Sequence, residues 1–177
     1  MYFKVDLRGE FRNIKAVVPA KICFIDVRCG KCKTKKDNIS IKHDYTYDLE
    51  IQKGDRNHTT TQEVNYTYKC SNEDCGNRIS INMEKLSDLE FYRRGESDVY
   101  ERVCKVVNDE YTIARFKSDS AIIETVRLPE ITFFTDENEV LSTSDFKGGV
   151  VTLTSKIGNP TGIIENFKIT VKEVNKK

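Results

Sequence analysis

Two pairs of cysteines are the residues of this chain whose type and spacing could do chemistry. Cys29 and Cys32 enclose two residues, and Cys70 and Cys75 enclose four. Zinc prefers four tetrahedral ligands, and two short turns can each supply two thiolates to one ion. A site closed by four thiolates leaves no position for a catalytic water, so its zinc is structural. The pattern therefore predicts a structural Zn²⁺ site formed by Cys29, Cys32, Cys70 and Cys75.

Other uses of these cysteines stay open at the level of the sequence. Two disulfides would satisfy the same four side chains, although disulfides are rare in reducing compartments. A redox Cys-x-x-Cys motif places its first thiol at a helix N-terminus, whereas Cys29 opens into Lys33–Asp37, which has no helical periodicity. Iron or copper could also use thiolate ligands. Zinc is the favoured interpretation.

The two cysteine pairs have the same surroundings. The first pair follows the apolar run Ile22–Val27 and precedes Ile39–Ile41, and the second follows Val64–Tyr68 and precedes Ile79–Ile81. Segments that alternate or run apolar and are rich in β-branched and aromatic residues are typical of strands. The plan of strand, cysteine turn and strand, present twice, predicts a zinc-ribbon-like site.

Periodicity of two extends along most of the chain. Glu84–Tyr92 is the candidate for a short helix, through Leu86 and Leu89, but Ser87 and Asp88 also indicate a turn. The sequence predicts an all-β fold, as an antiparallel sandwich or pseudo-barrel. The expected strands include Tyr2–Leu7, Ile22–Val27, Val64–Tyr68, Ile79–Ile81, Tyr111–Phe116, Ile131–Phe134, Val150–Leu153 and Phe167–Val174.

A pattern that occurs twice in the sequence suggests how the strands are organised. Phe3–Val18, closed by Pro19, and Tyr111–Leu128, closed by Pro129, share a plan of strand, polar turn and second apolar segment. Duplication of a β unit would explain this repeated pattern, and so would chance similarity among short strands. We predict two β units, residues 1–92 bearing the zinc and residues 93–177, packed together as one globular body.

Composition removes several classes of function. The chain has 177 residues, of which 38% are hydrophobic, and its 29 basic and 28 acidic residues give a formal net charge of +1. This balance produces no global field that would favour nucleic acid or a membrane surface. No stretch approaches the roughly 18 apolar residues of a membrane helix. The first residues alternate like a strand and not like a signal peptide, so we expect the cytosol or the nucleus.

The sequence carries no recognised catalytic motif. It contains no His-Glu-x-x-His zincin motif, no phosphate-binding glycine-rich loop and no Gly-x-Ser-x-Gly elbow. We therefore expect no enzymatic activity. A zinc-dependent interaction or adaptor module, with other proteins as partners, is the first functional hypothesis.

A basic and aromatic cluster provides the alternative, a nucleic-acid-binding zinc ribbon. Lysines with nearby aromatic rings can bind nucleic acid through phosphate contacts and base stacking. The same lysines could simply offset the charge of four thiolates and keep the turn soluble. The residues concerned are Lys31, Lys33, Lys35, Lys36, Tyr45 and Tyr47.

Several of these motifs occur together in an order seen elsewhere. An amphipathic strand leads through Asn13-Ile14 to a proline, and the first cysteine pair follows; then come Gly54–Arg56, Lys69-Cys70, and Cys75 before Ile79–Ile81. Over residues 1–82 the chain resembles the eukaryotic CXXC-motif-containing zinc-binding proteins, a family of unknown function. The resemblance implies a β-rich fold with two similar halves, zinc held by the four cysteines, and no established enzymatic activity.

Overall fold

The fold is antiparallel and almost entirely β. The computed structural model describes residues 1–52, 59–107, 109–146, 149–155, 158 and 160–175, so Gly54–Arg56 lie outside the described residues. The strands are β1 (Tyr2–Arg12), β2 (Ile14–Val17), β3 (Ile22–Cys29), β4 (Lys35–Lys42), β5 (Tyr47–Gln52), β6 (Thr59–Val64), β7 (Tyr66–Lys69), β8 (Arg78–Glu84), β9 (Leu89–Arg93), β10 (Tyr100–Cys104), β11 (Val106–Val107), β12 (Glu110–Asp119), β13 (Ala121–Arg127), β14 (Ile131–Thr135), β15 (Val140–Thr143), β16 (Val151–Thr154) and β17 (Pro160–Val174).

These elements confirm the all-β prediction. The segment Glu84–Tyr92 is not a helix: β8 ends at Glu84, a bend covers Ser87 and Asp88, and β9 begins at Leu89. The local turn residues therefore outweigh the helical spacing of Leu86 and Leu89. In the part of the chain that the structure describes, no helix has the length and apolar character needed to cross a membrane.

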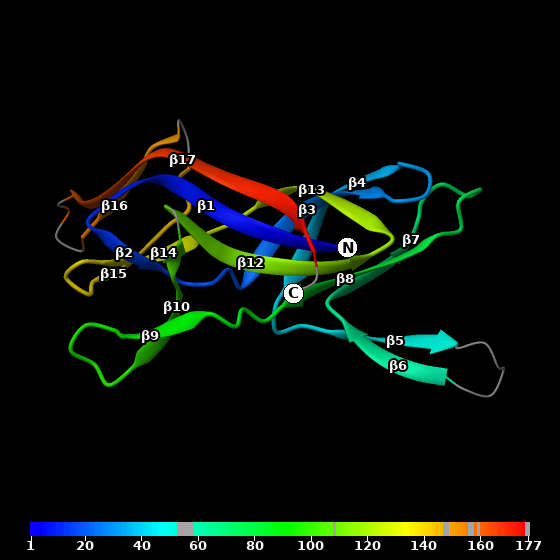
Figure 1. Ribbon diagram of the computed structural model, residues 1–177, viewed down its shortest axis with the longest axis horizontal. Coiled ribbons are helices and arrows are strands. Elements are labelled where there is room, and N and C mark those ends of the chain that lie inside the picture. The colour runs from blue at the N-terminus through cyan, green and yellow to red at the C-terminus, as the bar shows by residue number, and fades with distance from the viewer. Residues whose placement is uncertain (53–58, 108, 147–148, 156–157, 159, 176–177) are drawn as a thin grey trace.

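The described residues form four sheets (Figure 1). The large sheet has seven strands in the order β16-β17-β1-β12-β8-β7, with β11 paired to β12; the others run β15-β14-β2-β10-β9, β13-β3-β4 and β5-β6. In Figure 1 the molecule is elongated, with β4 and β7 toward one end and β15 and β16 toward the other. The β5–β6 hairpin projects from the end that carries β7.

Strand pairing relates the two halves of the chain by an approximate two-fold arrangement. β1 pairs with β12 at the centre; β17 pairs with β1 as β8 pairs with β12, and β14 pairs with β2 as β3 pairs with β13. Asn13 links β1 to β2 with φ 55°, and Ser120 links β12 to β13 with φ 66°. This agrees with the expected pair of similar β units. Strands from both halves share the sheets, and the division near residue 93 stays a prediction.

One large apolar cluster lies between the sheets. Alternation along β3 buries Cys23, Ile25, Val27 and Cys29 on one face, as the period-two pattern requires. The same cluster contains Phe116, Phe133 and strands from both halves, together with Cys70 and Cys75. The cysteine side chains therefore extend the core, whereas the residues between Cys70 and Cys75 are exposed.

Candidate metal centre

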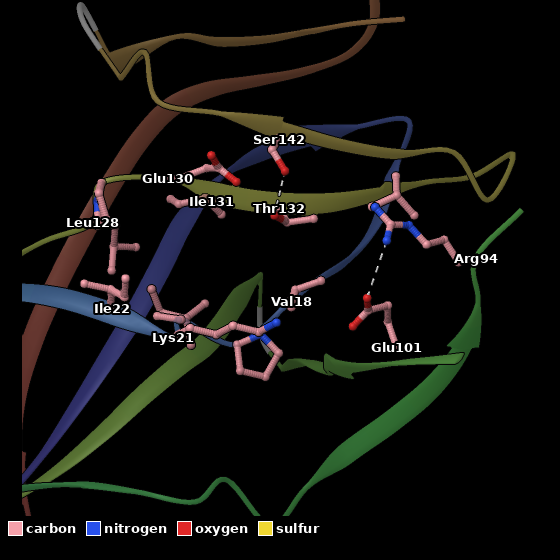
Figure 2. Close-up of a pocket in the computed structure, with 15 residues that line it drawn as sticks. Val18, Lys21, Ile22, Arg94, Glu101, Leu128, Glu130, Ile131, Thr132 and Ser142 are labelled. Carbon is pink, nitrogen blue, oxygen red and sulfur yellow. Dashed lines mark hydrogen bonds and ion pairs between the residues drawn. The ribbon is translucent and has the colours of Figure 1, made fainter. Parts of the chain in front are cut away.

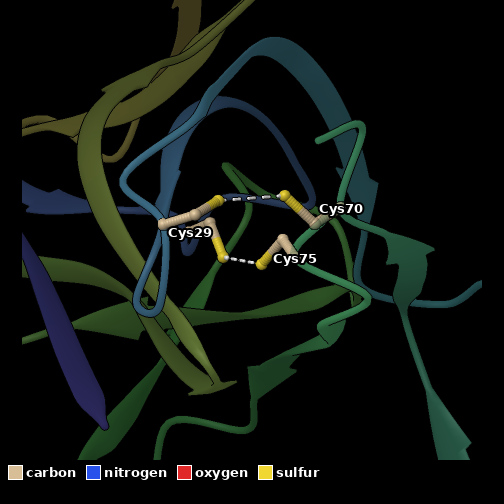
Figure 3. Close-up of side chains that lie close together, drawn as sticks. Cys29, Cys70 and Cys75 are labelled. Atoms are coloured by element: carbon tan, nitrogen blue, oxygen red, sulfur yellow. Dashed lines mark hydrogen bonds between the residues drawn. The ribbon is translucent and has the colours of Figure 1, made fainter. Parts of the chain in front are cut away.

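The four predicted ligands converge on one point. Cys29 is the last residue of β3 and Cys32 lies in the β3–β4 turn, whereas Cys70 and Cys75 lie in the β7–β8 turn. The ligand atoms of all four lie within 4.8 Å of one another. The Sγ atoms of Cys29 and Cys75 are 3.8 Å apart, and those of Cys32 and Cys70 are 3.4 Å apart (Figure 3). Each close contact thus joins one turn to the other.

The donor set fits a tetrahedral metal ion. A Zn–S distance of about 2.3 Å requires sulfurs about 3.8 Å apart at the corners of a tetrahedron. The contacts of 3.8 Å and 3.4 Å are close to that edge. Cys29, Cys70 and Cys75 are buried and Cys32 is half-buried, so water has little access to the cluster. The cluster could hold a metal ion with all four positions filled by sulfur.

Backbone N–H groups support every sulfur in the same way. The N–H two residues after each cysteine donates to its Sγ: Lys31 to Cys29, Thr34 to Cys32, Asn72 to Cys70, and Asn77 to Cys75. The two turns therefore present their sulfurs alike, although they enclose different numbers of residues. The wider spacing of Cys70 and Cys75 does not disturb the local geometry.

A left-handed residue follows the second cysteine of each turn. Lys33 has φ 65° and Gly76 has φ 60°. This backbone conformation turns the N–H groups of Thr34 and Asn77 back toward the preceding cysteines. Glycine adopts it without strain, whereas the lysine carries a modest steric cost. Gly30 has another role, because a Cβ there would approach the Ser120 carbonyl oxygen at 3.1 Å.

Two side chains connect the two turns: Asn77, which no sequence motif indicated, and Lys31, which the sequence analysis placed in the basic cluster. The Asn77 Nδ2 donates to Cys29 Sγ at 3.2 Å, so a residue of the second turn supports a sulfur of the first. The Lys31 Nζ donates to the Cys75 carbonyl oxygen at 3.2 Å in the opposite sense. The position of Asn77 two residues after Cys75 is a signal for its backbone N–H. No sequence signal indicates where its side chain points.

The pKa values of the first turn favour thiolates. Desolvation opposes ionisation of Cys29, but hydrogen bonds from the Cys32 N–H and Asn77 outweigh it and lower its pKa. Hydrogen bonds from the side chain and backbone of Thr34 lower the pKa of Cys32 to about 6. Metal binding requires deprotonated thiols, so the first turn is suited to begin coordination.

In the second turn, by contrast, the pKa values of both cysteines are raised. The Asn77 N–H lowers the pKa of Cys75, but desolvation and the neighbouring Cys32 and Cys29 sulfurs outweigh it and raise the pKa to about 11. The Asn72 N–H likewise fails to offset desolvation and neighbouring sulfurs at Cys70, whose pKa is raised. Four negative charges cannot accumulate here unless a cation compensates them.

The remaining cysteines lie outside the cluster. Cys23 and Cys104 are buried among apolar side chains, and burial raises the pKa of each to about 12. Such thiols are unreactive and act as small apolar side chains.

The lysines and tyrosines of the predicted basic and aromatic cluster make contacts within the protein. Lys31 and Lys33 donate to the carbonyl oxygens of Cys75 and Gly30, and Lys35 forms an ion pair with Glu124 at 3.6 Å. The Lys36 Nζ lies 4.3 Å from the centre of the Tyr68 ring. Two other tyrosines, Tyr45 and Tyr47, remain exposed and pack edge to face.

Fold and site together define an antiparallel all-β protein with a cluster of four cysteines that could hold a metal ion. No protein-family model and no curated protein sequence matches the chain at a significant level. Among solved structures, it is similar to a hypothetical protein from Plasmodium falciparum, with TM-score 0.65 and 13% identity over 97% of this chain and 99% of that one. It is also similar to C1orf123, with TM-score 0.67 and 15% identity over 98% of this chain and 100% of that one. At these identities the likeness concerns the fold alone.

Proposed function

We propose that this chain is a zinc-binding protein whose zinc is structural and whose β surfaces act as an interaction or adaptor module. The observation that carries the proposal is the convergence of four sulfurs within 4.8 Å from two turns. The membership of the CXXC-motif-containing zinc-binding family suggested by the motifs of residues 1–82 is part of the same proposal. Free thiols at this site suit a reducing compartment, so we propose the cytosol or nucleus.

A structural role is favoured over a catalytic one. Catalytic zinc keeps a position for water or substrate, whereas four sulfurs complete the tetrahedron here. The bound ion would supply positive charge that holds four thiolates together and ties the β3–β4 turn to the β7–β8 turn. Function then depends on the surfaces that this connection keeps in place.

Removing a ligand tests the proposal. We expect Cys29→Ser and Cys75→Ser to lose zinc, measured by elemental analysis of the purified protein. Structural zinc contributes on the order of 10 kcal/mol, and each kcal/mol lowers the melting temperature by roughly 2–4 °C at this size. The melting temperature should therefore fall by about 20 °C or more.

Cys104→Ser is the matched control, because Cys104 is buried but lies outside the cluster. It should keep its zinc even if the buried hydroxyl lowers stability. Unchanged metal content and melting in the Cys29 and Cys75 variants would contradict the proposal.

Nucleic-acid binding remains the alternative proposal, supported by the exposed rings of Tyr45 and Tyr47 and by the exposed lysines of the first cysteine turn. Binding of single-stranded RNA, measured as salt is varied, separates the two functions. Phosphate contacts would give affinity that falls steeply with salt. Absence of binding at low salt would eliminate this alternative and leave the zinc proposal untouched.

A further inference from the structure

One side of β10 is open over most of the strand. β10 pairs with β9 along its length, from Tyr100↔Arg93 to Cys104↔Leu89, but it pairs with β2 at Cys104↔Val17 alone. In an antiparallel sheet, alternate residues direct their N–H and C=O groups to either side. Between Tyr100 and Val103, the described residues provide no strand partner on the side opposite β9. Backbone groups of β10 therefore face a gap.

The other wall of this gap is the segment Val18–Lys21. The chain turns away from β10 here because the Val18 N–H donates to the Thr132 carbonyl oxygen at 2.9 Å, and the Ala20 N–H donates to that of Ile113 at 2.9 Å. β10 and this segment therefore diverge from the Cys104↔Val17 pair, and the backbone groups on the Val18–Lys21 side are partly satisfied elsewhere. The opening is a consequence of the strand pairing and lies inside the five-stranded sheet.

Two cavities flank the gap, one toward each face of β10. The first has a volume of about 550 Å³ and is lined by Glu101 and Arg94, whose side chains share one face of the β9–β10 hairpin. Figure 2 shows Val18 and Glu101 on one side of it and Thr132 and Ser142 on the other. The second has a volume of about 310 Å³ and is lined by Tyr100 and Arg102, which point to the opposite face. Both cavities share Val18–Lys21, Glu101 and Ile113.

This arrangement matches the geometry of an added strand. Successive side chains of a strand point to opposite faces, so a strand paired with β10 would direct alternate side chains into the two cavities. Apolar side chains line part of the first cavity and most of the second. The first contains Val18, Ile22, Leu128, Ile131 and Val140, and the second contains Met83, Leu86, Leu89, Ile113 and Ala114.

The charged side chains around the second cavity indicate which type of residue a bound strand would place there. Lys21, Lys85 and Arg102 line this cavity, and within the described residues none of the three has a carboxylate at ion-pair distance. Of the two glutamates there, Glu101 is already paired with Arg94 at 3.9 Å. With Glu84 as the other glutamate, three cationic and two anionic side chains leave this cavity with a formal charge of +1, which complements an acidic side chain.

The neighbouring surface has the composition of a protein interface. Phe91 is 63% exposed and Tyr100 is 61% exposed, although both are large aromatic residues. Arg102 lies over the Phe91 ring, with its guanidinium carbon 5.6 Å from the ring centre. Exposed aromatic residues beside arginine are frequent energetic centres of protein interfaces.

We propose that the gap between β10 and Val18–Lys21 is a docking site for an extended segment of another protein. The segment adds to β10 as a strand, places apolar side chains alternately in the two cavities, and presents an acidic residue to Lys21, Lys85 and Arg102. This inference builds on the proposed role as an interaction module, and it concerns a surface separate from the cysteine cluster.

The test uses the intact, zinc-loaded protein as bait for a displayed library of short random peptides. We expect enrichment of peptides with apolar residues at alternate positions and an acidic residue near one end. Binding of one of the enriched peptides, made synthetically, should shift the backbone NMR signals of Tyr100–Val103 and Val18–Lys21. N-methylation of those peptide amides that face β10 should abolish binding, whereas N-methylation of the intervening amides should not.

Protein variants locate the site. Val140→Lys in the first cavity and Leu86→Lys in the second should each weaken the peptide by about ten-fold or more. Val107→Lys is the matched control, because Val107 is exposed and outside both cavities. Melting and zinc content are measured for every variant, so loss of peptide with zinc retained reports on the groove. Loss of zinc bears on the proposed function instead.

Four results would overturn the proposal. The library could yield no specific binder, the binder could map to another surface, or both sets of N-methylated peptides could bind equally. A dimer that forms through this gap at raised protein concentration, detected by analytical ultracentrifugation, would also overturn it, because the occupant would then be a second copy of the chain.

Discussion

The sulfur of Cys29 receives hydrogen bonds from both turns. Lys31 and Cys32 supply N–H groups from its own turn, and the Asn77 side chain supplies another from the opposite turn. The Asn77 Nδ2 also lies 3.3 Å from the Ser120 carbonyl oxygen, which fixes its orientation. Hydrogen bonds of this kind orient a metal ligand and stabilise its ionised form. Asn77 is thus part of the cysteine cluster without offering a sulfur of its own.

Replacing Asn77 should weaken metal binding without abolishing it. We expect Asn77→Ala to lower zinc affinity by roughly 10-fold, because the loss of partners around a ligand typically costs 10- to 100-fold. Competition with a chromophoric chelator measures the change. Asn72→Ala is the matched control, because the Asn72 side chain accepts from the Asp74 N–H and does not contact a sulfur. Equal affinities for the two variants would show that the Asn77 contact has no effect.

At the scale of single residues, the four cysteines could be predicted as ligands from the sequence. The hydrogen bonds that their sulfurs receive could not. Paired cysteines between apolar runs reveal two hairpin turns because spacing is a local property. The contact from Asn77 to Cys29 joins residues 48 positions apart and depends on how the two turns face each other. Similarly, the two pairs differ in spacing, yet the second cysteine of each receives a hydrogen bond from the N–H two residues later. This shared pattern follows from the positive φ angles of Lys33 and Gly76.

Asp26 forms hydrogen bonds where the pairing of β3 with its two neighbouring strands is irregular. The register of β3 shifts against β4 between Ile25 and Val27, and that of β13 against β3 shifts between Ile123 and Thr125. Asp26 lies at this place and accepts hydrogen bonds from Arg127 at 2.5 Å, Thr125 at 2.5 Å and the Asn38 N–H at 2.8 Å. One carboxylate thereby connects three strands where the regular ladder is interrupted.

The Asp26 contacts predict a pH-dependent contribution to stability. Hydrogen bonds from Arg127, Thr125 and the Asn38 N–H hold the pKa of Asp26 well below its ordinary value. The stabilisation is therefore complete above the unfolded-state pKa of about 4 and is lost as the pH falls below it. The melting temperature of Asp26→Asn should lie below that of the unaltered protein at pH 7. The gap should narrow as the pH falls from about 4 to about 2.

Thermal melts of both proteins at each pH measure this gap. Protonation of the cysteine cluster affects both proteins alike, so the difference isolates Asp26. A gap that stays constant across the range would mean that the carboxylate charge does not act through these contacts.

The elements themselves follow from the sequence more closely than their partners do. Alternation along β3 predicts both the strand and its buried face. The pairing of β17 with β1, and the divergence of β10 from β2, join segments far apart in the chain. Pairing partners are set by packing across the whole molecule, so no window of sequence contains them.

Across the whole molecule, each half depends on the other for its sheets. β1 lies between β12 and β17, and β8 lies between β12 and β7. We expect a fragment of residues 1–92 to lack cooperative thermal unfolding, since β1, β3 and β8 each lose a partner strand. Circular dichroism melts of the zinc-loaded fragment, compared with the full chain, measure this. A sharp transition like that of the full chain would show instead that residues 1–92 fold on their own.

The two-fold arrangement contains only one set of paired cysteines. The β3–β4 and β7–β8 turns of the first half correspond to the β14–β15 and β16–β17 connections of the second, and no cysteine follows Cys104 in the sequence. The two ends of the molecule therefore share a strand plan but differ in chemistry. At the end bearing β15 and β16, Val151 and Leu153 are buried in the apolar core.

The central position of β1 also has a consequence for biosynthesis. The Met1 N-terminus bonds to the Ser118 carbonyl oxygen across 117 positions, and the apolar side chains of Phe3, Val5 and Leu7 point into the core. A ribosome completes both cysteine turns well before it delivers β12 or β17. We expect the nascent chain to capture zinc while β1 still has no neighbours and its apolar face is accessible to chaperones. Metal supply would then matter at the moment of translation, before the sheet can close.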